Sequence, residues 1–160
     1  MIKNETIKNE SKVWLNRIIK EQKIKIRYYI TIKYNEDKSR TIEQTEKLFR
    51  HFKNLLLCRI YQVTNKSRLP TERIKLIAFH EMGESQTHFH SHILIETIPN
   101  YPTLESIESL LKMIQKKHKG IDNGKSGTDV RFHHSYQKTY SLKQATNRYI
   151  PLDVYNSDLI

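Results

Sequence analysis

Cysteine and long apolar runs are both scarce in this sequence. Its 160 residues include one cysteine, Cys58, which excludes an internal disulfide and a cysteine-based zinc site. Cys58 follows three leucines and is predicted to be a buried thiol. No stretch approaches the roughly 18 consecutive apolar residues of a membrane span, and the first residues lack the apolar run of a secretory signal. These absences predict one intracellular domain, residues 1–160, without a membrane partner.

Acidic residues and glycine are also few. The chain has 17 acidic residues against 28 lysines and arginines, so its formal net charge is +11. Such an excess on a small domain favours a polyanionic partner, with nucleic acid ahead of an anionic membrane. A solvated basic surface without a partner is the alternative. With only four glycines the chain has no Gly-x-x-x-x-Gly-Lys-Ser/Thr loop, which excludes a helicase motor built on that motif.

The spacing of apolar residues predicts an α+β domain. Helical spacing occurs in residues 10–23, 41–61, 104–119 and 141–150, and β-rich segments are 24–34, 74–80, 87–97 and 128–136. After an N-terminal helical extension, residues 1–23, the order is β-α-β-β-α-β followed by one short helix before Pro151. This order is ferredoxin-like and predicts an antiparallel sheet under two helices. The fold hosts many functions and decides none of them.

Four of the eight histidines lie between residues 80 and 92. In a strand, His88, His90 and His92 share one face, and the apolar residues between them can face the helices, so we expect the imidazoles on an open face of the sheet. Histidines two residues apart are separated by about 7 Å along a strand, so both reach one metal if their rings lean together. Glu81, just before the hairpin turn, is placed to add a carboxylate. A solvated polar face is the alternative, favoured for His80 alone.

Two nitrogens and one oxygen form a mixed ligand set. Such a set suits Mn²⁺ or Mg²⁺, although zinc would also bind. It leaves positions open for a phosphate oxygen and water. The predicted cofactor is therefore Mn²⁺ or Mg²⁺, held by two of the three alternating histidines and Glu81.

This histidine pattern resembles the signature of HUH endonucleases, the group of rolling-circle replication initiators, relaxases and single-strand transposases. The signature is a pair of histidines around one residue, followed by an apolar run, in the middle strand of such a fold. In initiators a carboxylate precedes the pair, with a glycine between, and Glu81 and Gly83 stand in that order here. The resemblance covers about residues 24–152. Two registers remain open: His90 with His92, which is favoured, or His88 with His90.

The resemblance also implies a tyrosine nucleophile on the helix after the last strand, often within Tyr-x-x-Lys. Tyr149 is the first candidate, because the phrase Phe-His that precedes such tyrosines in viral initiators occurs at residues 132–133. Leu152 stands where the lysine is expected. A literal Tyr-x-x-Lys runs from Tyr140 to Lys143 and is the second candidate. Core packing or base stacking is the alternative for any of the nine tyrosines.

The activity that the resemblance implies is metal-dependent nicking and joining of single-stranded DNA through a 5′-phosphotyrosine. The substrate would be a replication origin or the end of a mobile element, and Tyr28, Lys138 and Arg148 are expected to contact the DNA. Without a motor in the chain, a host helicase and polymerase are implied partners. Rolling-circle replication of a plasmid, virus or mobile element, in the cytoplasm of a prokaryotic host or encoded by a virus, is the favoured role.

Two other functions remain open. A transposase or relaxase would use the same chemistry. A non-catalytic ferredoxin-like module that binds nucleic acid is the alternative from another class, and it should be indifferent to a chelator.

Overall fold

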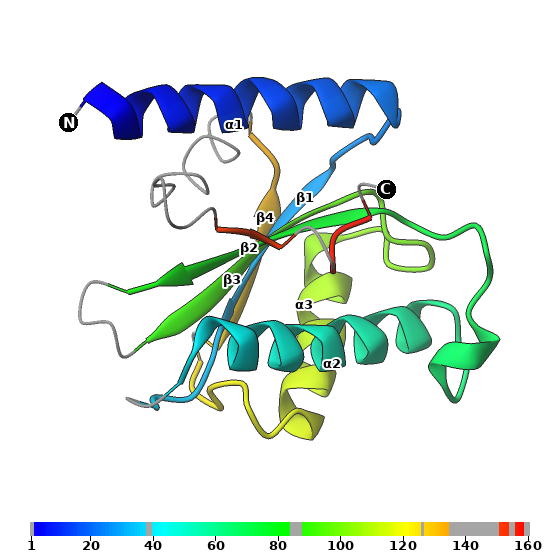
Figure 1. The fold of residues 1–160 in the computed structure, drawn as a ribbon. Helices are drawn as coiled ribbons and strands as arrows, with labels where there is room; N and C mark the ends of the chain where they lie inside the picture. Colours follow the sequence, from blue (N-terminus) through cyan, green and yellow to red (C-terminus); the bar gives the residue numbers. More distant parts are fainter. Residues whose placement is uncertain are drawn as a thin grey trace.

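The computed structural model describes residues 2–37, 40–83, 88–125, 127–134, 151–153 and 156–158. Within these ranges, three α-helices surround one five-stranded antiparallel sheet (Figure 1). The helices are α1 (Ile2–Glu21), α2 (Ile42–Ile60) and α3 (Leu104–Lys117), with a short 3-10 helix η1 (Lys66–Arg68). The strands are β1 (Tyr28–Lys33), β2 (Leu76–Met82), β3 (Phe89–Ile95), β4 (Thr128–Phe132) and β5 (Leu152–Asp153). No helix in the described ranges has the length and hydropathy needed to cross a membrane.

The strand order in the sheet is β4-β1-β3-β2-β5, and every neighbouring pair is antiparallel. From β1 to β4 the elements follow the order β-α-β-β-α-β, which agrees with the ferredoxin-like expectation and confirms the predicted α+β class. β5 was not predicted. It pairs with β2, with Asp153 opposite Ala78 and Leu152 opposite Phe79.

Both faces of the sheet are covered, as Figure 1 shows with α1 on one side and α2 and α3 on the other. Most of the core lies on the α2 and α3 side, where Phe49, Phe52 and Ile93 are fully buried. On the other side, Leu15 of α1 packs with Phe79 and other strand residues in a smaller apolar cluster. The expectation of an open second face was therefore wrong. The face carries its own apolar residues, and burying them against α1 is favourable.

Local sequence explains where the helices begin. Thr41 and Thr103 are the N-caps of α2 and α3, and each exchanges hydrogen bonds with the residue three positions later, Gln44 or Ser106. α1 begins at Ile2, earlier than the apolar spacing indicated. Cys58 of α2, which was predicted to be buried, is a partly exposed residue.

The C-terminal residues follow the outer side of β2. Besides the short pairing with β5, the backbone N–H of Ala78 donates to Ser157 Oγ (2.9 Å). The backbone N–H of Leu76 donates to Asp158 Oδ2 (3.1 Å), and the Asp158 N–H donates back to the Leu76 carbonyl (2.8 Å). The side chains of Ser157 and Asp158 thus accept hydrogen bonds from β2 that a neighbouring strand backbone would otherwise accept.

Candidate metal centre

Glu81, His90 and His92 lie together on the side of the sheet that faces α1. The β-rich segment predicted from the sequence ended at residue 80, but β2 continues to Met82, so Glu81 is a strand residue directly opposite His90. His92 lies opposite Phe79 on β2 and opposite Thr31 on β1. Side chains at these positions share a face because alternation is kept along the strands.

The carboxylate of Glu81 lies between the two imidazoles. Its Oε2 atom is 3.0 Å from Nε2 of His92, and its Oε1 atom is 3.9 Å from Nε2 of His90. The ring centroids of the two histidines are 5.8 Å apart, less than the spacing of about 7 Å along a strand, so the rings lean together. Glu81 and His92 are buried, whereas the side chain of His90 is 23% exposed, so the centre is reached by solvent from the His90 side.

Two neighbours on β1 hold the ring of His92. Thr31 Oγ1 lies 3.2 Å from Nδ1, and the ring of Tyr29 stacks on the imidazole at 5.3 Å between centroids, with 17° between the planes. With Nδ1 occupied by the threonine hydroxyl, Nε2 is the nitrogen directed at Glu81. Partners of this kind orient histidine ligands and strengthen metal binding.

Gly83 lies close to His88 and His90 at the end of the hairpin. A Cβ atom at this position would lie 3.0 Å from the carbonyl oxygen of His88 and 3.6 Å from Cε1 of His90. Its N–H donates to that same carbonyl at 2.7 Å. Glycine therefore allows a close approach to the carbonyl of His88, whereas a Cβ would meet the His90 ring at an ordinary van der Waals distance.

The donor set of these three residues fits a divalent cation. Two ligands about 2.1 Å from an octahedral ion and at right angles to each other are about 3 Å apart, which matches the 3.0 Å between His92 Nε2 and Glu81 Oε2. His90 Nε2 is farther away and would have to move closer. Across the described ranges, no three histidine, cysteine, aspartate or glutamate side chains are already grouped tightly enough to hold an ion. The residues thus provide suitable ligands in an arrangement that an ion would have to tighten.

His88 is not part of this group. It lies outside β3, its side chain is 53% exposed, and its Nε2 is 3.9 Å from the carboxylate of Glu36. Of the two registers left open by the sequence, the geometry favours His90 with His92.

His80, favoured as a solvated residue, is buried on the opposite face at 1% exposure. Its Nδ1 lies 2.7 Å from Ser91 Oγ, and its Nε2 lies 2.8 Å from Asp153 Oδ2. A serine, a histidine and an aspartate in line resemble a hydrolase triad. However, Ser91 and Asp153 are 0% and 2% exposed, so no substrate reaches the hydroxyl. This chain of contacts is structural.

Most of the predicted DNA-contacting and nucleophilic residues lie outside the described ranges. They are Lys138, Tyr140, Lys143, Arg148 and Tyr149. Tyr28 is described, and it is 3% exposed in the core on the α2 and α3 side, so its ring is not presented to a base. Instead it stacks on Phe132 at 5.8 Å, and Phe132 is 44% exposed beneath the guanidinium of Arg27.

Sequence reasoning missed Lys33, an exposed residue of β1 that lies directly opposite His90. By alternation it shares the face of Thr31, whose hydroxyl contacts His92. A cation beside two imidazoles and a carboxylate is placed to contact a phosphate. The only sequence signal was the alternation of Tyr29, Thr31 and Lys33, which does not reveal the strand opposite.

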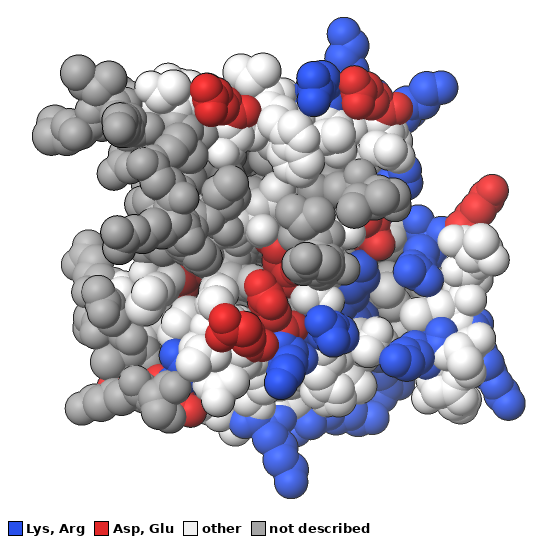
Figure 2. All heavy atoms as spheres, viewed as in Figure 1, with Lys and Arg blue, Asp and Glu red and all other residues white. Residues whose placement is uncertain are grey.

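Besides Lys33 near the candidate centre, a second group of basic side chains lies on the surface around α2 and η1. Figure 2 shows lysine and arginine side chains gathered in the lower and right parts of the view, around α2 and η1, with few acidic residues among them. Exposed basic residues of this region include Lys47, Arg59, Lys66, Arg68 and Arg73. The surface suits a polyanion but does not by itself specify one.

Comparison with protein-family models, with curated proteins and with solved structures finds no significant match to this chain. The resemblance to HUH endonucleases therefore depends on Glu81, Gly83, His90 and His92, together with the element order around them.

Proposed function

We propose that this protein is a metal-dependent endonuclease of the HUH type, which nicks and rejoins single-stranded DNA through a 5′-phosphotyrosine. The observation that supports this most is the meeting of Glu81, His90 and His92 on one face of the sheet, with the carboxylate between the two imidazoles. Mn²⁺ or Mg²⁺ is the proposed cofactor. Initiation of rolling-circle replication is the proposed role, with a transposase or relaxase as the alternative use of the same chemistry.

Each residue of the centre has a separate task in this proposal. Glu81, His90 and His92 hold the ion, while Thr31 and Tyr29 fix the ring of His92. A bound divalent ion supplies positive charge that polarises the scissile phosphodiester and stabilises its transition state. The DNA strand approaches from the side of His90, whose ring is the most exposed of the three. Lys33, opposite His90, contacts the phosphate or its neighbour.

Tyr149 is the proposed nucleophile. Its hydroxyl gives up a proton as the oxygen forms a bond to phosphorus, the bond from phosphorus to the 3′ oxygen breaks, and the leaving 3′ oxygen takes up a proton to become a 3′-hydroxyl, so no net proton is gained or lost. The phosphodiester energy is kept in the tyrosine linkage, so the same groups rejoin the strand in reverse.

Tyr149 is favoured over Tyr140 as the nucleophile because fewer residues separate it from Pro151, which contacts β2. The carbonyl of Pro151 accepts a hydrogen bond from the N–H of His80 (2.7 Å), and His80 immediately precedes Glu81. Tyr149 is two residues before Pro151, so chain geometry confines its Cα to within about 7 Å of that of Pro151. Tyr140 is eleven residues before Pro151, so the same contact limits its position much less.

DNA binding in the proposal depends mainly on charge. The net charge of +11 favours association with phosphates, and each phosphate neutralised releases condensed counterions. The chain carries no ATPase loop of the Gly-x-x-x-x-Gly-Lys type, so a host helicase and polymerase are the proposed partners.

The experiment is incubation of the protein with a mixed pool of single-stranded DNA and Mn²⁺, followed by a denaturing gel. We expect a covalent protein–DNA adduct that EDTA prevents and that is lost in the His90→Ala/His92→Ala variant. His88→Ala is the matched control and should form the adduct normally, because His88 lies with Glu36. Absence of the adduct from the wild-type protein over a diverse pool would reject the proposal.

A non-catalytic nucleic-acid-binding module is the second candidate. It is favoured by one observation: His92 and Glu81 already form a close contact that needs no metal, as a hydrogen bond or ion pair. DNA binding that is unchanged by EDTA, with no adduct and no nicking, would support this candidate instead.

A further inference from the structure

A polar network, buried in its inner part, joins the C-terminal residues to β2, to β3, to Tyr34 just after β1 and to α2. Its inner part is a line of four side chains, which runs from Tyr34 through Ser91 and His80 to Asp153. The distances are 2.8 Å from Tyr34 Oη to Ser91 Oγ, 2.7 Å from Ser91 Oγ to His80 Nδ1 and 2.8 Å from His80 Nε2 to Asp153 Oδ2. All four residues are at most 2% exposed. Burial raises the pKa of Tyr34 well above its ordinary value, so its hydroxyl stays neutral in this line.

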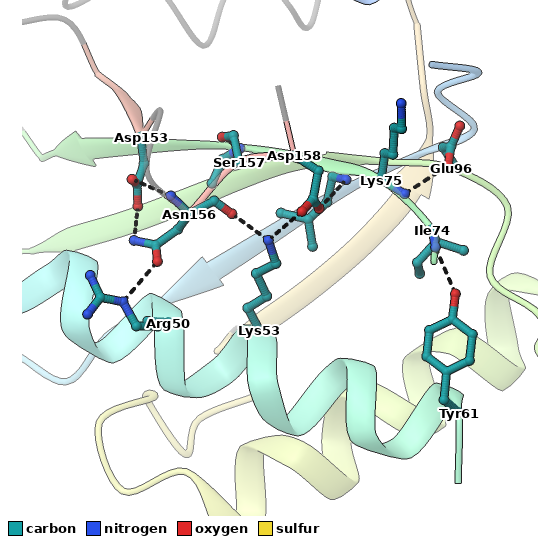
Figure 3. Close-up of polar contacts among 12 residues, drawn as sticks. Arg50, Lys53, Tyr61, Ile74, Lys75, Glu96, Asp153, Asn156, Ser157 and Asp158 are labelled. Carbon is teal, nitrogen blue, oxygen red and sulfur yellow. Dashed lines mark hydrogen bonds and ion pairs between the residues drawn. The ribbon is translucent and has the colours of Figure 1, made fainter. Parts of the chain in front are cut away.

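The outer part of the network links the same segment to α2, as Figure 3 shows. Asp153 Oδ1 accepts from the backbone N–H of Asn156 (3.0 Å), and Asp153 Oδ2 accepts from its side-chain amide (2.6 Å). Arg50 Nε donates to Asn156 Oδ1 (3.0 Å), while Lys53 Nζ donates to the Asn156 carbonyl (2.8 Å) and to Asp158 Oδ1 (2.9 Å). We call the whole set the C-terminal network: Tyr34, Ser91, His80, Asp153, Asn156, Asp158, Arg50 and Lys53.

This network determines one register for β5. A two-residue strand forms few backbone bonds, so its own pairing holds it weakly. Buried polar groups cost free energy unless they are hydrogen-bonded. If β5 slipped by one residue, the carboxylate of Asp153 would turn to the opposite face, and His80 would lose its partner inside the core. The polar contacts therefore select the observed placement of β5.

His80 and Glu81 connect this network to the candidate metal centre. The two residues are consecutive on β2 and point to opposite faces, so His80 binds Asp153 while Glu81 contacts His92. The backbone N–H of His80 also holds the carbonyl of Pro151. Pro151, which immediately precedes β5, is thereby tied through His80 to the proposed metal ligand Glu81.

We propose that the C-terminal network is a positioning device: it holds Pro151 and β5 in place beside His80 and Glu81, and the covalent chain then limits how far Tyr149, two residues before Pro151, can lie from the centre of Glu81, His90 and His92. The inference depends on the proposed function and adds the residues that place its nucleophile. Asp153, Asn156 and Ser91 are positioning residues in this scheme, since none of them touches DNA or the ion. Misplacement of a reacting group by about 1 Å lowers a rate on the order of 100-fold.

The test compares single-turnover adduct formation by the full-length wild-type protein and by Asp153→Ala, at saturating Mn²⁺ and DNA. We expect the rate to fall on the order of 10- to 100-fold, while the dissociation constants for Mn²⁺ and for DNA change by less than about threefold. The ratio of cleaved to rejoined strand at equilibrium should stay the same, since positioning affects both directions equally. Asp153→Asn, which keeps an acceptor oxygen for His80, should recover part of the rate.

Tyr61→Phe is the matched control. It removes the hydrogen bond from the Ile74 N–H to the Tyr61 hydroxyl (2.7 Å), which also joins α2 to the chain entering β2 but lies outside the network. If the Asp153→Ala rate falls no more than that of Tyr61→Phe at equal loss of thermal stability, the positioning role is rejected. Should Asp153→Ala fail to fold, Asn156→Ala provides the same comparison. A wild-type protein without an adduct would reject the proposed function itself, whereas an active Asp153→Ala would reject only this inference.

Discussion

Nε2 of His92 and Oε2 of Glu81, on neighbouring strands, lie 3.0 Å apart in a buried setting. This separation suits a hydrogen bond, and it equally suits two adjacent ligands of one cation. An imidazole nitrogen ligates a metal only when it carries no proton, so ion and proton compete for this atom.

The first prediction is a single Mn²⁺ site. Calorimetry should show one binding event, which is lost in His90→Ala/His92→Ala and weakened by Glu81→Gln, because these changes remove the ligands. His88→Ala should bind as the wild type does, since that side chain is exposed beside Glu36. Equal binding by the double variant would place the site elsewhere.

The second prediction concerns Thr31, which fixes the His92 ring through Nδ1 at 3.2 Å. Thr31→Val keeps the shape of the side chain but removes the hydroxyl. We expect a loss of Mn²⁺ affinity of about tenfold, as is usual for a residue that orients a ligand. Thr128→Val is the control, because it removes a hydroxyl that bonds Gln115 at 3.2 Å instead. A similar loss in both variants would mean that the effect is one of general stability.

The third prediction is that Tyr149→Phe abolishes strand cleavage and the covalent adduct but leaves DNA binding within about twofold of the wild type. The change removes the attacking oxygen and keeps the ring. Peptide mapping of the wild-type adduct by mass spectrometry should find the nucleotide on Tyr149. A nucleotide on Tyr140 would assign the nucleophile to that residue, with Lys143 beside it. Nicking without an adduct would leave water as the nucleophile.

The fourth prediction is that Lys33→Met weakens single-stranded DNA binding and lowers the slope of log affinity against log salt by about one, as expected for one lost phosphate contact. Lys116→Met on α3 changes the net charge equally, but α3 covers the opposite face of the sheet. The control should therefore keep the wild-type slope. Equal slopes for the two variants would place the DNA away from His90.

The fifth prediction concerns stability in acid. Burial raises the pKa of Asp153, but hydrogen bonds from His80 and Asn156 outweigh this and hold the pKa below its ordinary value. A carboxyl group with a lowered folded-state pKa stabilises the protein above its unfolded pKa, and this contribution is lost as the pH falls through the folded-state pKa. Unfolding free energy should therefore decrease below about pH 4, and less steeply in Asp153→Asn. Denaturant titrations between about pH 6 and about pH 2 measure this change; an equal loss of unfolding free energy in the wild type and in Asp153→Asn would contradict the assignment.

Periodicity was enough to predict the fold class, because alternating and helical patterns report directly on local structure. The register was not predictable. That Lys33 lies opposite His90 depends on how β1 and β3 pair, which involves residues far apart in the chain. Tyr28 was assigned to the wrong environment for a related reason: both faces of β1 are covered, so alternation alone does not tell which residues stay accessible.

β5 was missed because its position is decided by distant polar contacts. Leu152 and Asp153 are too short a segment to show a period, and the partner of Asp153, His80, lies 73 residues earlier. The grouping of Glu81, His90 and His92, by contrast, was predicted from the sequence because the three residues belong to one hairpin. Sequence reasoning succeeds here when the site is local and fails when it is assembled from distant segments.

The contacts of Ser157 and Asp158 with β2 also affect how molecules of this protein meet one another. β5 pairs with only two residues of β2, which would leave the outer edge of that strand with free N–H groups. Such an edge is a template to which a second chain adds, and it promotes aggregation. Here the N–H groups of Leu76 and Ala78 are already bound by the side chains of Asp158 and Ser157. These two residues therefore occupy the N–H groups that a second chain would need in order to add to this edge of the sheet.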